Sequence, residues 1–385
     1  MQTLTSRRIP ALDGLRGIAI LAVLVHHQLT PLRLPGGFLG VDLFFVLSGF
    51  LITGLLLGEF RQTAAISLRK FYLRRVLRLG PALFLYLLGC LLVTWYYQPS
   101  EFTRELKLIG IALAYATNWR MAFGWDTSLD PTAIIWSLSI EEQFYLIWPL
   151  LLFACLALKF SRRAIVCGLA LMIIAIIVNR YSLLSGGANL TRLYYGTDTH
   201  ADALLLGCIV AFVPVIHMRV RWFTLLGLLL ATTLGYLVAT TDFTSLFLYR
   251  GGFTLISLLA GILILVVANS PSSLIALALK WRVLRWFGQI SYGLYLWHWL
   301  VIRNVSLFYL GWWEPWAKLA LALGIASASF YFVEKPFNRM KARYEVKRSP
   351  SPPQADGTPS PTLDLPVLPV AQPNEKTTGA TPVPA

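Results

Sequence analysis

The sequence predicts an all-α fold, a polytopic integral membrane bundle of about ten transmembrane helices with both termini in the cytoplasm. Composition is the first observation behind this prediction. Of the 385 residues, 57% are hydrophobic and 13% are charged, and the mean hydropathy is +0.65, which few soluble chains reach. The second observation is that apolar runs of membrane-spanning length recur along the chain. The third is that Lys and Arg gather in the short segments between these runs.

Ten apolar runs have the length expected of membrane spans. They lie at about 13–30, 38–57, 79–97, 132–158, 164–179, 201–216, 223–240, 250–268, 288–310 and 316–333. An eleventh run, at 106–118, is short and flanked by charge. If this run does not cross and the N-terminus is cytoplasmic, 22 Lys and Arg lie inside against seven outside, as the positive-inside rule requires. Because a crossing would destroy that bias, we predict an interfacial or re-entrant element at 106–118.

The net charge of +15 does not indicate a nucleic-acid partner. The basic residues lie in short loops, where they orient spans and favour anionic lipid headgroups. We expect residues 1–346 to form one membrane domain. Ten of the 21 prolines lie between Pro350 and Pro384, so we expect 347–385 to be a disordered, proline-rich cytoplasmic tail.

The first span, DGLRGIAILAVLVHH from Asp13 to His27, carries an arginine near one end and a histidine pair at the other. Arg16 and His27 are eleven residues apart, which places them within roughly 20° of the same helix face and about 16 Å apart along the axis. A charge inside a span is expensive and is seldom accidental. This face therefore indicates a site that holds an anion at one end and performs proton chemistry at the other.

The second and third spans add a carboxylate and a basic cluster. Asp42 shares a helix face with Gly49 and Thr53, and we expect Arg16 or another buried cation to pair with it. The glycine is more readily explained by close helix packing than by function. At the start of the third span, the arginines at positions 74, 75 and 78 either set the topology or bind phosphate, since guanidinium groups are bidentate phosphate donors.

The fourth span contains WSLSIEEQFYLIWP, in which Trp136, Ser139 and Glu142 occupy adjoining positions at helical spacing. The adjacent carboxylates Glu141 and Glu142 point about 100° apart, so one can serve a site while the other pairs structurally. Which of the two serves the site stays open.

Two later spans carry further polar side chains. His200 and Asp202 open the sixth span, where capping explains them about as well as chemistry does. Ser291, Tyr295 and His298 form a polar stripe on the ninth span, either a functional face or one holding a structural histidine.

The sequence contains no nucleophile elbow, no HExxH, no phosphate-binding GxxxxGK[ST] and no dinucleotide fingerprint. A histidine of ordinary pKa suits a general base, and a phosphorylated ligand entering from the cytoplasm would meet the basic cluster first. The residues therefore favour group transfer from a phosphorylated donor to a hydroxyl. A proton-coupled transporter of an envelope precursor, or a scaffold with structural polar pairs, stays open as an alternative.

Seven strings in order resemble the type 3 membrane acyltransferases, the bacterial family of O-antigen and surface-polysaccharide acetyltransferases, over about 10–340. They are LDGLRGIAILAVLVHH, GGFLGVDLFFVLSGFLIT, FYLRRVLRLGP, WSLSIEEQFYLIWP, HADALLLG, ISYGLYLWHW and FVEKPF. The family's first-span pattern is an arginine, ten residues, then a histidine. This pattern selects His27 over His26, in agreement with the helix-face argument.

The resemblance implies an acyltransferase of the bacterial inner membrane. Its donor would be acyl-CoA, often acetyl-CoA, as a co-substrate from the cytoplasm, with no permanently bound cofactor or metal. Its acceptor would be a hydroxyl of a surface carbohydrate, a lipid-linked sugar or a similar molecule. The oligomeric state stays open.

From the residues and the resemblance together, we assign three roles. The predicted catalytic residues are His27, Glu142 and Asp42. The predicted donor-binding residues are Arg16, Arg74, Arg75 and Arg78. The predicted substrate-binding residues are Trp136, Ser139, Tyr295 and His298.

Overall fold

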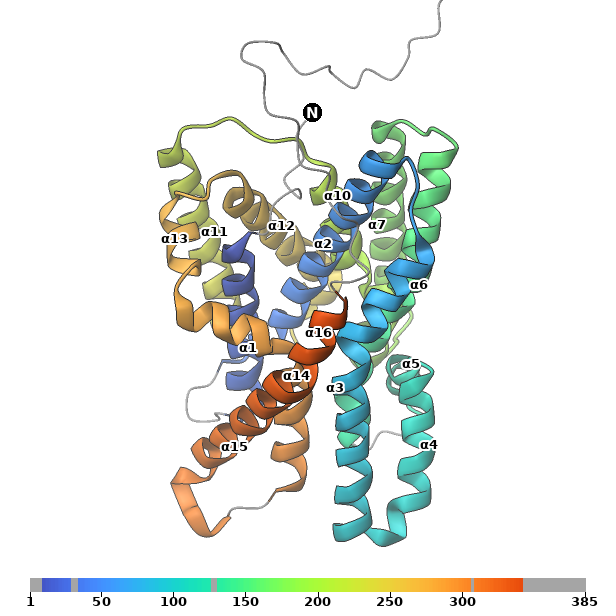
Figure 1. Ribbon diagram of the computed structural model, residues 1–385, viewed down its shortest axis with the longest axis vertical. Coiled ribbons are helices and arrows are strands. Elements are labelled where there is room, and N and C mark those ends of the chain that lie inside the picture. Colours follow the sequence, from blue (N-terminus) through green and yellow to red (C-terminus); the bar gives the residue numbers. More distant parts are fainter. Residues whose placement is uncertain (1–8, 29–33, 126–129, 306–307, 342–385) are drawn as a thin grey trace, which may run out of the picture. The chain divides into compact units, whose positions relative to one another are not determined.

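The computed structural model describes residues 9–28, 34–125, 130–305 and 308–341, and within these ranges it contains helices and no β-strand (Figure 1). The predicted tail at 347–385 lies outside the described residues. The first half of the chain forms α1 (Pro10–Gln28), η3 (Gly37–Leu39), α2 (Gly40–Thr63), α3 (Leu68–Tyr97), η4 (Pro99–Glu101), α4 (Phe102–Leu113), α5 (Thr117–Ala122), η5 (Pro131–Ile135), α6 (Trp136–Ala157), α7 (Arg162–Ser185) and α8 (Leu190–Tyr195).

The second half forms α9 (Thr197–His200), α10 (Asp202–Phe212), α11 (Val220–Thr240), η6 (Leu248–Gly252), α12 (Phe253–Asn269), α13 (Leu274–Leu279), α14 (Arg282–Asn304), η7 (Phe308–Trp313), α15 (Glu314–Ala328), η8 (Ser329–Glu334) and α16 (Lys335–Lys341). Within the described residues, each of the ten predicted runs therefore overlaps a helix. Side-chain caps set several of the starts. Ser161 accepts a hydrogen bond from the Ala164 amide at α7, and Asn189 does the same for Arg192 at α8.

Seven helical segments within the described residues are long and apolar enough to cross a membrane, so the protein is a multi-pass membrane protein. The three other predicted spans correspond to α1, α10 and α14. Polar and charged side chains lower the hydropathy of α1 and α14, whereas α10 has only 11 residues. All three are among the more deeply buried helices, and burial against protein relaxes the demand for an apolar surface.

The run at 106–118 does not form a membrane-length helix. It is divided between α4, of 12 residues, and α5, of six, with Tyr115 in a left-handed conformation at the break (φ 51°). In Figure 1, α4 returns beside the lower part of α3, and the chain turns again before α6. Neither piece is long enough to cross a bilayer.

Helix α1 is the central element, packed against α2 on one side and α14 on the other. Small residues allow this close approach. A Cβ on Gly288 of α14 would overlap the carbonyl oxygen of Asp13 on α1, and a Cβ on Gly49 of α2 would overlap the carbonyl oxygen of Leu204 on α10. Gly49 therefore has the packing role that the sequence favoured for it. The close contact of α1 with α14 is also what assembles the site.

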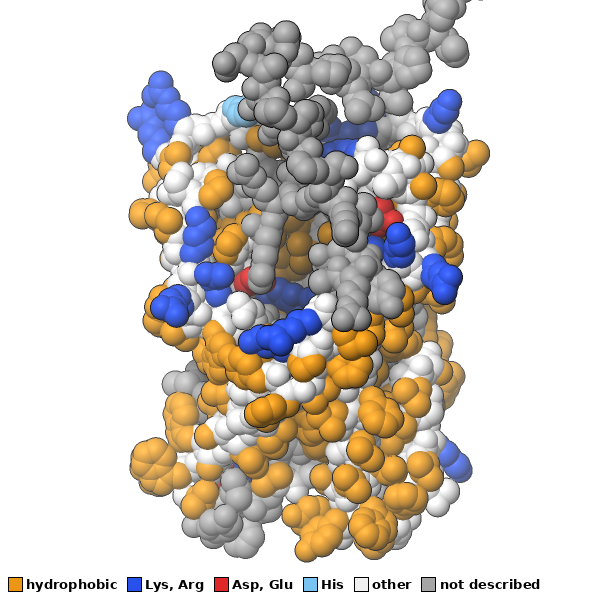
Figure 2. Space-filling view, in the orientation of Figure 1, with side chains coloured by type: hydrophobic (Ala, Val, Ile, Leu, Met, Phe, Trp, Pro, Cys, Tyr) orange, Lys and Arg blue, Asp and Glu red, His pale blue; other side chains and the backbone are white. Residues whose placement is uncertain are grey.

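The helix connections separate into two ends. In Figure 1, the α2–α3, α6–α7 and α10–α11 connections lie toward the upper end, and the α3–α4 connection lies at the lower end. Figure 2 shows Lys and Arg side chains mainly on the upper half of this face and hydrophobic side chains over much of the lower half. Three of the basic segments that the sequence assigned to one side, the α2–α3, α6–α7 and α10–α11 connections, thus lie toward one end of the helices.

Candidate active site

Two histidines from opposite ends of the sequence meet where α1 packs on α14. The Nδ1 atom of His27 lies 3.1 Å from the Nε2 atom of His298, and the two rings stack with centroids 5.3 Å apart. His298 is buried, whereas His27 is half-buried. Sequence analysis singled out both residues, but only the packing of the two helices shows that they form a pair.

The hydrogen bonds around this pair define its tautomers. The Nδ1 atom of His298 lies 2.9 Å from the carbonyl oxygen of Leu294, and a carbonyl only accepts. His298 Nδ1 is therefore the donor, which leaves Nε2 of the neutral ring as an acceptor for the Nδ1 proton of His27. The lone pair of His27 is then on its Nε2 atom. This arrangement suits a general base, because it orients the ring and leaves one nitrogen able to take a proton.

The neighbouring histidine has a different environment. The Nδ1 atom of His26 lies 3.1 Å from the carbonyl oxygen of Leu34, and its ring packs against Phe38 with centroids 5.4 Å apart. These contacts join the end of α1 to Leu34 and to η3. The two adjacent histidines therefore have different partners, a second histidine for His27 and a backbone carbonyl for His26.

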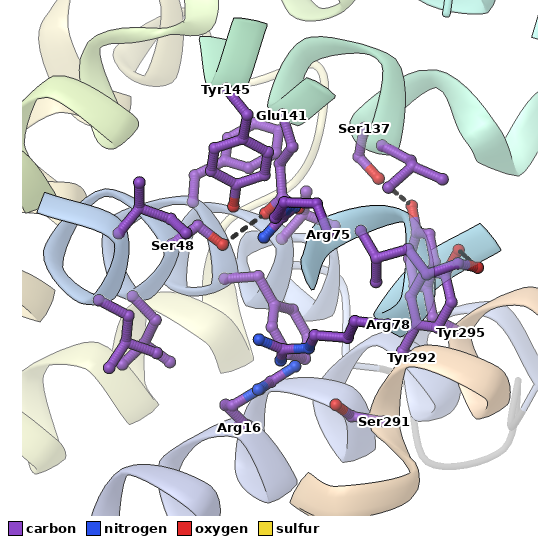
Figure 3. Close-up of a pocket in the computed structure, with 18 of the residues that line it drawn as sticks. Arg16, Ser48, Arg75, Arg78, Ser137, Glu141, Tyr145, Ser291, Tyr292 and Tyr295 are labelled. Atoms are coloured by element: carbon purple, nitrogen blue, oxygen red, sulfur yellow. Dashed lines mark hydrogen bonds between the residues drawn. The ribbon is translucent and has the colours of Figure 1, made fainter. Parts of the chain in front are cut away.

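A cavity opens between α1, α2, α3, α6 and α14 (Figure 3). Apolar side chains of α2 form one wall. The polar lining, drawn and labelled in Figure 3, consists of Arg16, Ser48, Arg75, Arg78, Ser137, Glu141, Tyr145, Ser291, Tyr292 and Tyr295. Four of the predicted site residues, Arg16, Arg75, Arg78 and Tyr295, thus come together with their neighbours from five helices.

Three guanidinium groups dominate the electrostatics of the cavity. Arg75 forms an ion pair with Glu142 at 2.8 Å and lies 3.6 Å above the ring of Tyr145, which fixes its position. Arg16 and Arg78 extend toward one another in Figure 3, from α1 and α3. Two like charges in a confined space repel, so an anion between them would be stabilised. Arg74 differs from these three, because it pairs with Glu59 at 3.1 Å and does not line the cavity.

Neutral and acidic groups continue the polar lining toward the histidines. Ser48 donates to Glu141 at 2.7 Å, and the hydroxyls of Ser137 and Tyr295 are 2.7 Å apart. The ring of Tyr295 lies 5.8 Å from that of His298, one turn further along α14. Tyr295 therefore stands between the arginines of the cavity and the histidine pair. Of the two adjacent carboxylates, Glu141 faces the cavity and Glu142 serves as the partner of Arg75.

Three of the predicted site residues lie elsewhere. The carboxylate of Asp42 is fully buried and accepts a hydrogen bond from His200 Nε2 at 2.9 Å, so Arg16 is not its partner. Trp136 is buried and stacks on His200. The Ser139 hydroxyl donates to the carbonyl of Ile135 in its own helix. These contacts hold α2, α6 and α9 together, and none of the three lines the cavity.

Sequence reasoning missed Ser48, Ser137, Tyr145 and Tyr292 as lining residues. A weak signal existed for the serines, because each places a hydroxyl inside a predicted span. Tyr145 had no such signal, since tyrosine is common in membrane helices and its role here depends on the guanidinium of Arg75 above its ring.

The fold and the site define a class, a polytopic membrane protein with a charged cavity and a histidine pair between its helices. The sequence profile described as "Acyltransferase domain" matches residues 9–333. The chain therefore belongs to the type 3 membrane acyltransferase family, as the resemblance implied.

Several curated proteins are similar to this chain. YrhL of Bacillus subtilis (strain 168) is 37% identical over 366 residues, which cover 89% of this chain and 57% of YrhL. The peptidoglycan O-acetyltransferase OatA of Listeria monocytogenes (strain EGD-e) is 34% identical over 357 residues, covering 86% of this chain and 56% of OatA. The O-acetyltransferase OatA of Staphylococcus aureus (strain NCTC 8325) is 35% identical over 361 residues, covering 86% and 58%. The chain thus spans less than two thirds of these relatives. No solved structure matches it.

Proposed function

We propose that this protein is a membrane O-acyltransferase that moves an acetyl or other acyl group from acyl-CoA to a hydroxyl of a carbohydrate acceptor. One observation carries the proposal. A histidine pair, with its basic nitrogen defined by hydrogen bonding, lies next to a cavity that holds three arginines. Family membership supports the same activity.

The arginines suit the donor. Coenzyme A carries several phosphate oxygens, which guanidinium groups bind with paired, charge-assisted hydrogen bonds. We propose that Arg16, Arg75 and Arg78 hold these phosphates and that the thioester end extends past Ser137 and Tyr295 toward His27. Along α1, Arg16 and His27 are about 16 Å apart, a distance that an extended pantetheine arm covers.

The histidine pair suits the transfer step. His27 Nε2 takes the proton of the acceptor hydroxyl, and the oxygen forms a bond to the acyl carbonyl carbon. The carbon–sulfur bond then breaks, and the CoA thiolate receives the proton back from His27. His298 accepts the Nδ1 hydrogen bond throughout, so it orients His27 and stabilises the imidazolium that forms between the two proton transfers.

We further propose that the acceptor is a cell-envelope glycan that approaches from the side opposite the arginines. Two of the relatives support an O-acetylated acceptor, and OatA of Listeria monocytogenes acts, by its name, on peptidoglycan. Peptidoglycan or a lipid-linked precursor of it is therefore the first acceptor to test. The membrane would be the bacterial inner, or cytoplasmic, membrane, where CoA donors and envelope precursors are both within reach.

The test is acetyl transfer in membranes that carry the full-length protein, with labelled acetyl-CoA and a peptidoglycan disaccharide as acceptor. His27→Ala is expected to lower transfer at least about 100-fold, because the general base is lost. His26→Ala, the adjacent matched variant, is expected to lose much less. An active His27→Ala protein would refute the mechanism. Transport of the sugar without release of CoA thiol would favour the proton-coupled transporter instead.

A further inference from the structure

A second cavity lies at the opposite end of the site, between the end of α3, the start of α4, η5 and the end of α14. Its lining is almost entirely polar and includes Gln98, Glu101, Arg104, Glu105, Asp130 and Arg303. On α3, the first cavity ends at Leu79 and the second begins at Thr94, about 22 Å further along the axis. The two cavities are therefore separate.

The histidine pair lies between the two cavities. Along α14, Tyr295 and Leu296 line the first cavity, His298 follows, and Arg303 lines the second, about 7 Å beyond His298. Trp299 connects the second cavity to the catalytic base. Its ring meets that of His27 edge-on with centroids 5.3 Å apart, and its Nε1 donates to the carbonyl oxygen of Asp130 at 3.0 Å.

Among the residues that line the second cavity, Glu105 has an unsatisfied polar atom. The residue is only 4% exposed, and its Oε1 atom is buried with no hydrogen-bond partner. Burying a carboxylate oxygen without a hydrogen-bond partner costs free energy. Here the carboxylate borders a cavity that a ligand with a hydrogen-bond donor could enter. Helix α4 is not one of the membrane-length helices. Burial and the nearby Asp130 raise the pKa of Glu105 to about 7, against the opposing effect of Arg104 and Arg120.

The charges of the lining select the kind of ligand. Glu101 pairs with Arg104 at 3.0 Å, and Asp130 pairs with the buried Arg120 at 2.7 Å, so much of the charge is compensated. A simple cation would be repelled by the guanidinium groups and a simple anion by the carboxylates. A hydroxyl both donates and accepts, so a polyhydroxylated ligand can satisfy carboxylates, guanidiniums and the amide of Gln98 together.

We propose that this second cavity binds a sugar of the acceptor glycan, with Glu105 accepting a hydrogen bond from one of its hydroxyls and Trp299 lying between Asp130 of the cavity lining and His27. The inference rests on the proposed function, because it assigns the acceptor side of the same transfer. It also explains why the histidine pair lies between two polar cavities, one for the donor and one for the acceptor.

Binding is measured on the full-length protein in nanodiscs with a defined probe, the disaccharide N-acetylglucosaminyl-N-acetylmuramic acid, by calorimetric titration. All proteins carry His27→Ala, so that no transfer occurs during the titration. Glu105→Gln is expected to weaken disaccharide binding about tenfold or more, because the amide loses one strong acceptor oxygen. Gln98→Trp, at an exposed position on the rim, is expected to abolish binding by filling the cavity.

Lys107→Gln is the matched control, since it lies exposed on the same helix but outside the cavity, and it should bind as the parent does. The proposal is overturned if the parent does not bind the disaccharide, or if Glu105→Gln and Gln98→Trp bind it as tightly as the control. A separate assay of CoA-thiol release by the protein with His27 intact tests the proposed function. A protein that binds the sugar but releases no thiol would therefore refute the transferase and leave the sugar site established.

Discussion

At the scale of single residues, the contact between His27 and His298 bears on the role of His298. This residue could bind the substrate, or it could orient His27, and the two roles can be distinguished by experiment. His298 was predicted to bind substrate, but its two ring nitrogens face Leu294 and His27. In the proposed mechanism it is therefore a positioning residue, whose effect on the reaction would pass through His27.

His298→Leu is expected to lower kcat about 10- to 100-fold while the KM for acetyl-CoA stays nearly constant, because the donor is held by the distant arginines. His298→Gln should recover part of the loss, since its side-chain oxygen can accept the Nδ1 hydrogen of His27. Steady-state kinetics of both variants provides the measurement. Equal losses in the two variants, or a raised KM for acetyl-CoA alone, would contradict the positioning role.

At the scale of elements, the site depends on how closely α1 approaches α14. Gly17 of α1 and Gly288 of α14 lie where the two backbones nearly touch, and a Cβ at either position would meet backbone atoms of the facing helix. This close packing sets the rotation of the two helices. It thereby decides that His27 and His298 face each other.

Gly288→Ala is expected to destabilise the protein by about 1–3 kcal/mol and to lower transfer, because the added methyl group forces the helices apart. Gly168→Ala on α7 is the matched control, since no atom lies within 4 Å of the position that its Cβ would take. That variant should be as stable as the parent or slightly more so, since alanine favours helix. Thermal unfolding in detergent and transfer in membranes are the two readouts. Retention of both by Gly288→Ala would show that the helix contact is looser than the structure indicates.

At the scale of the whole molecule, the distribution of basic residues predicts which end of the helices faces the cytoplasm. The α2–α3 connection belongs to the predicted inner side and the α3–α4 connection to the outer side. The arginine cavity would then open toward the pool of acyl-CoA, and the second cavity toward the envelope.

Cysteine labelling tests this orientation in a background with the four native cysteines replaced by alanine. Ser100→Cys, exposed at η4, is expected to react with a membrane-impermeant maleimide in intact cells, because that end faces outward. Gln62→Cys, exposed at the end of α2, should react only after the membrane is permeabilised. The reverse labelling pattern would show that the protein has the opposite orientation in the membrane. The second cavity would then face the cytoplasm, which contradicts its proposed role in binding the acceptor.

The sequence by itself determined the class of the protein, the position of its helices and part of its site. These properties are local. Apolar runs form helices in a membrane whatever their neighbours are, and helical periodicity alone places Arg16 and His27 on one face. The short run at 106–118 could be recognised in the same way, from its length and its flanking charge.

Only the tertiary structure decided which side chains from different helices meet. A run of arginines does not reveal that Arg75 and Arg78 line the cavity while Arg74 pairs with Glu59, because that depends on the rotation of α3 against α2 and α6. The same holds for Asp42, whose partner is His200 and not Arg16. Helix rotation is set by small residues and packing over long sequence separations. For that reason the contact of His27 with His298, and the two cavities on either side of it, could be recognised only in three dimensions.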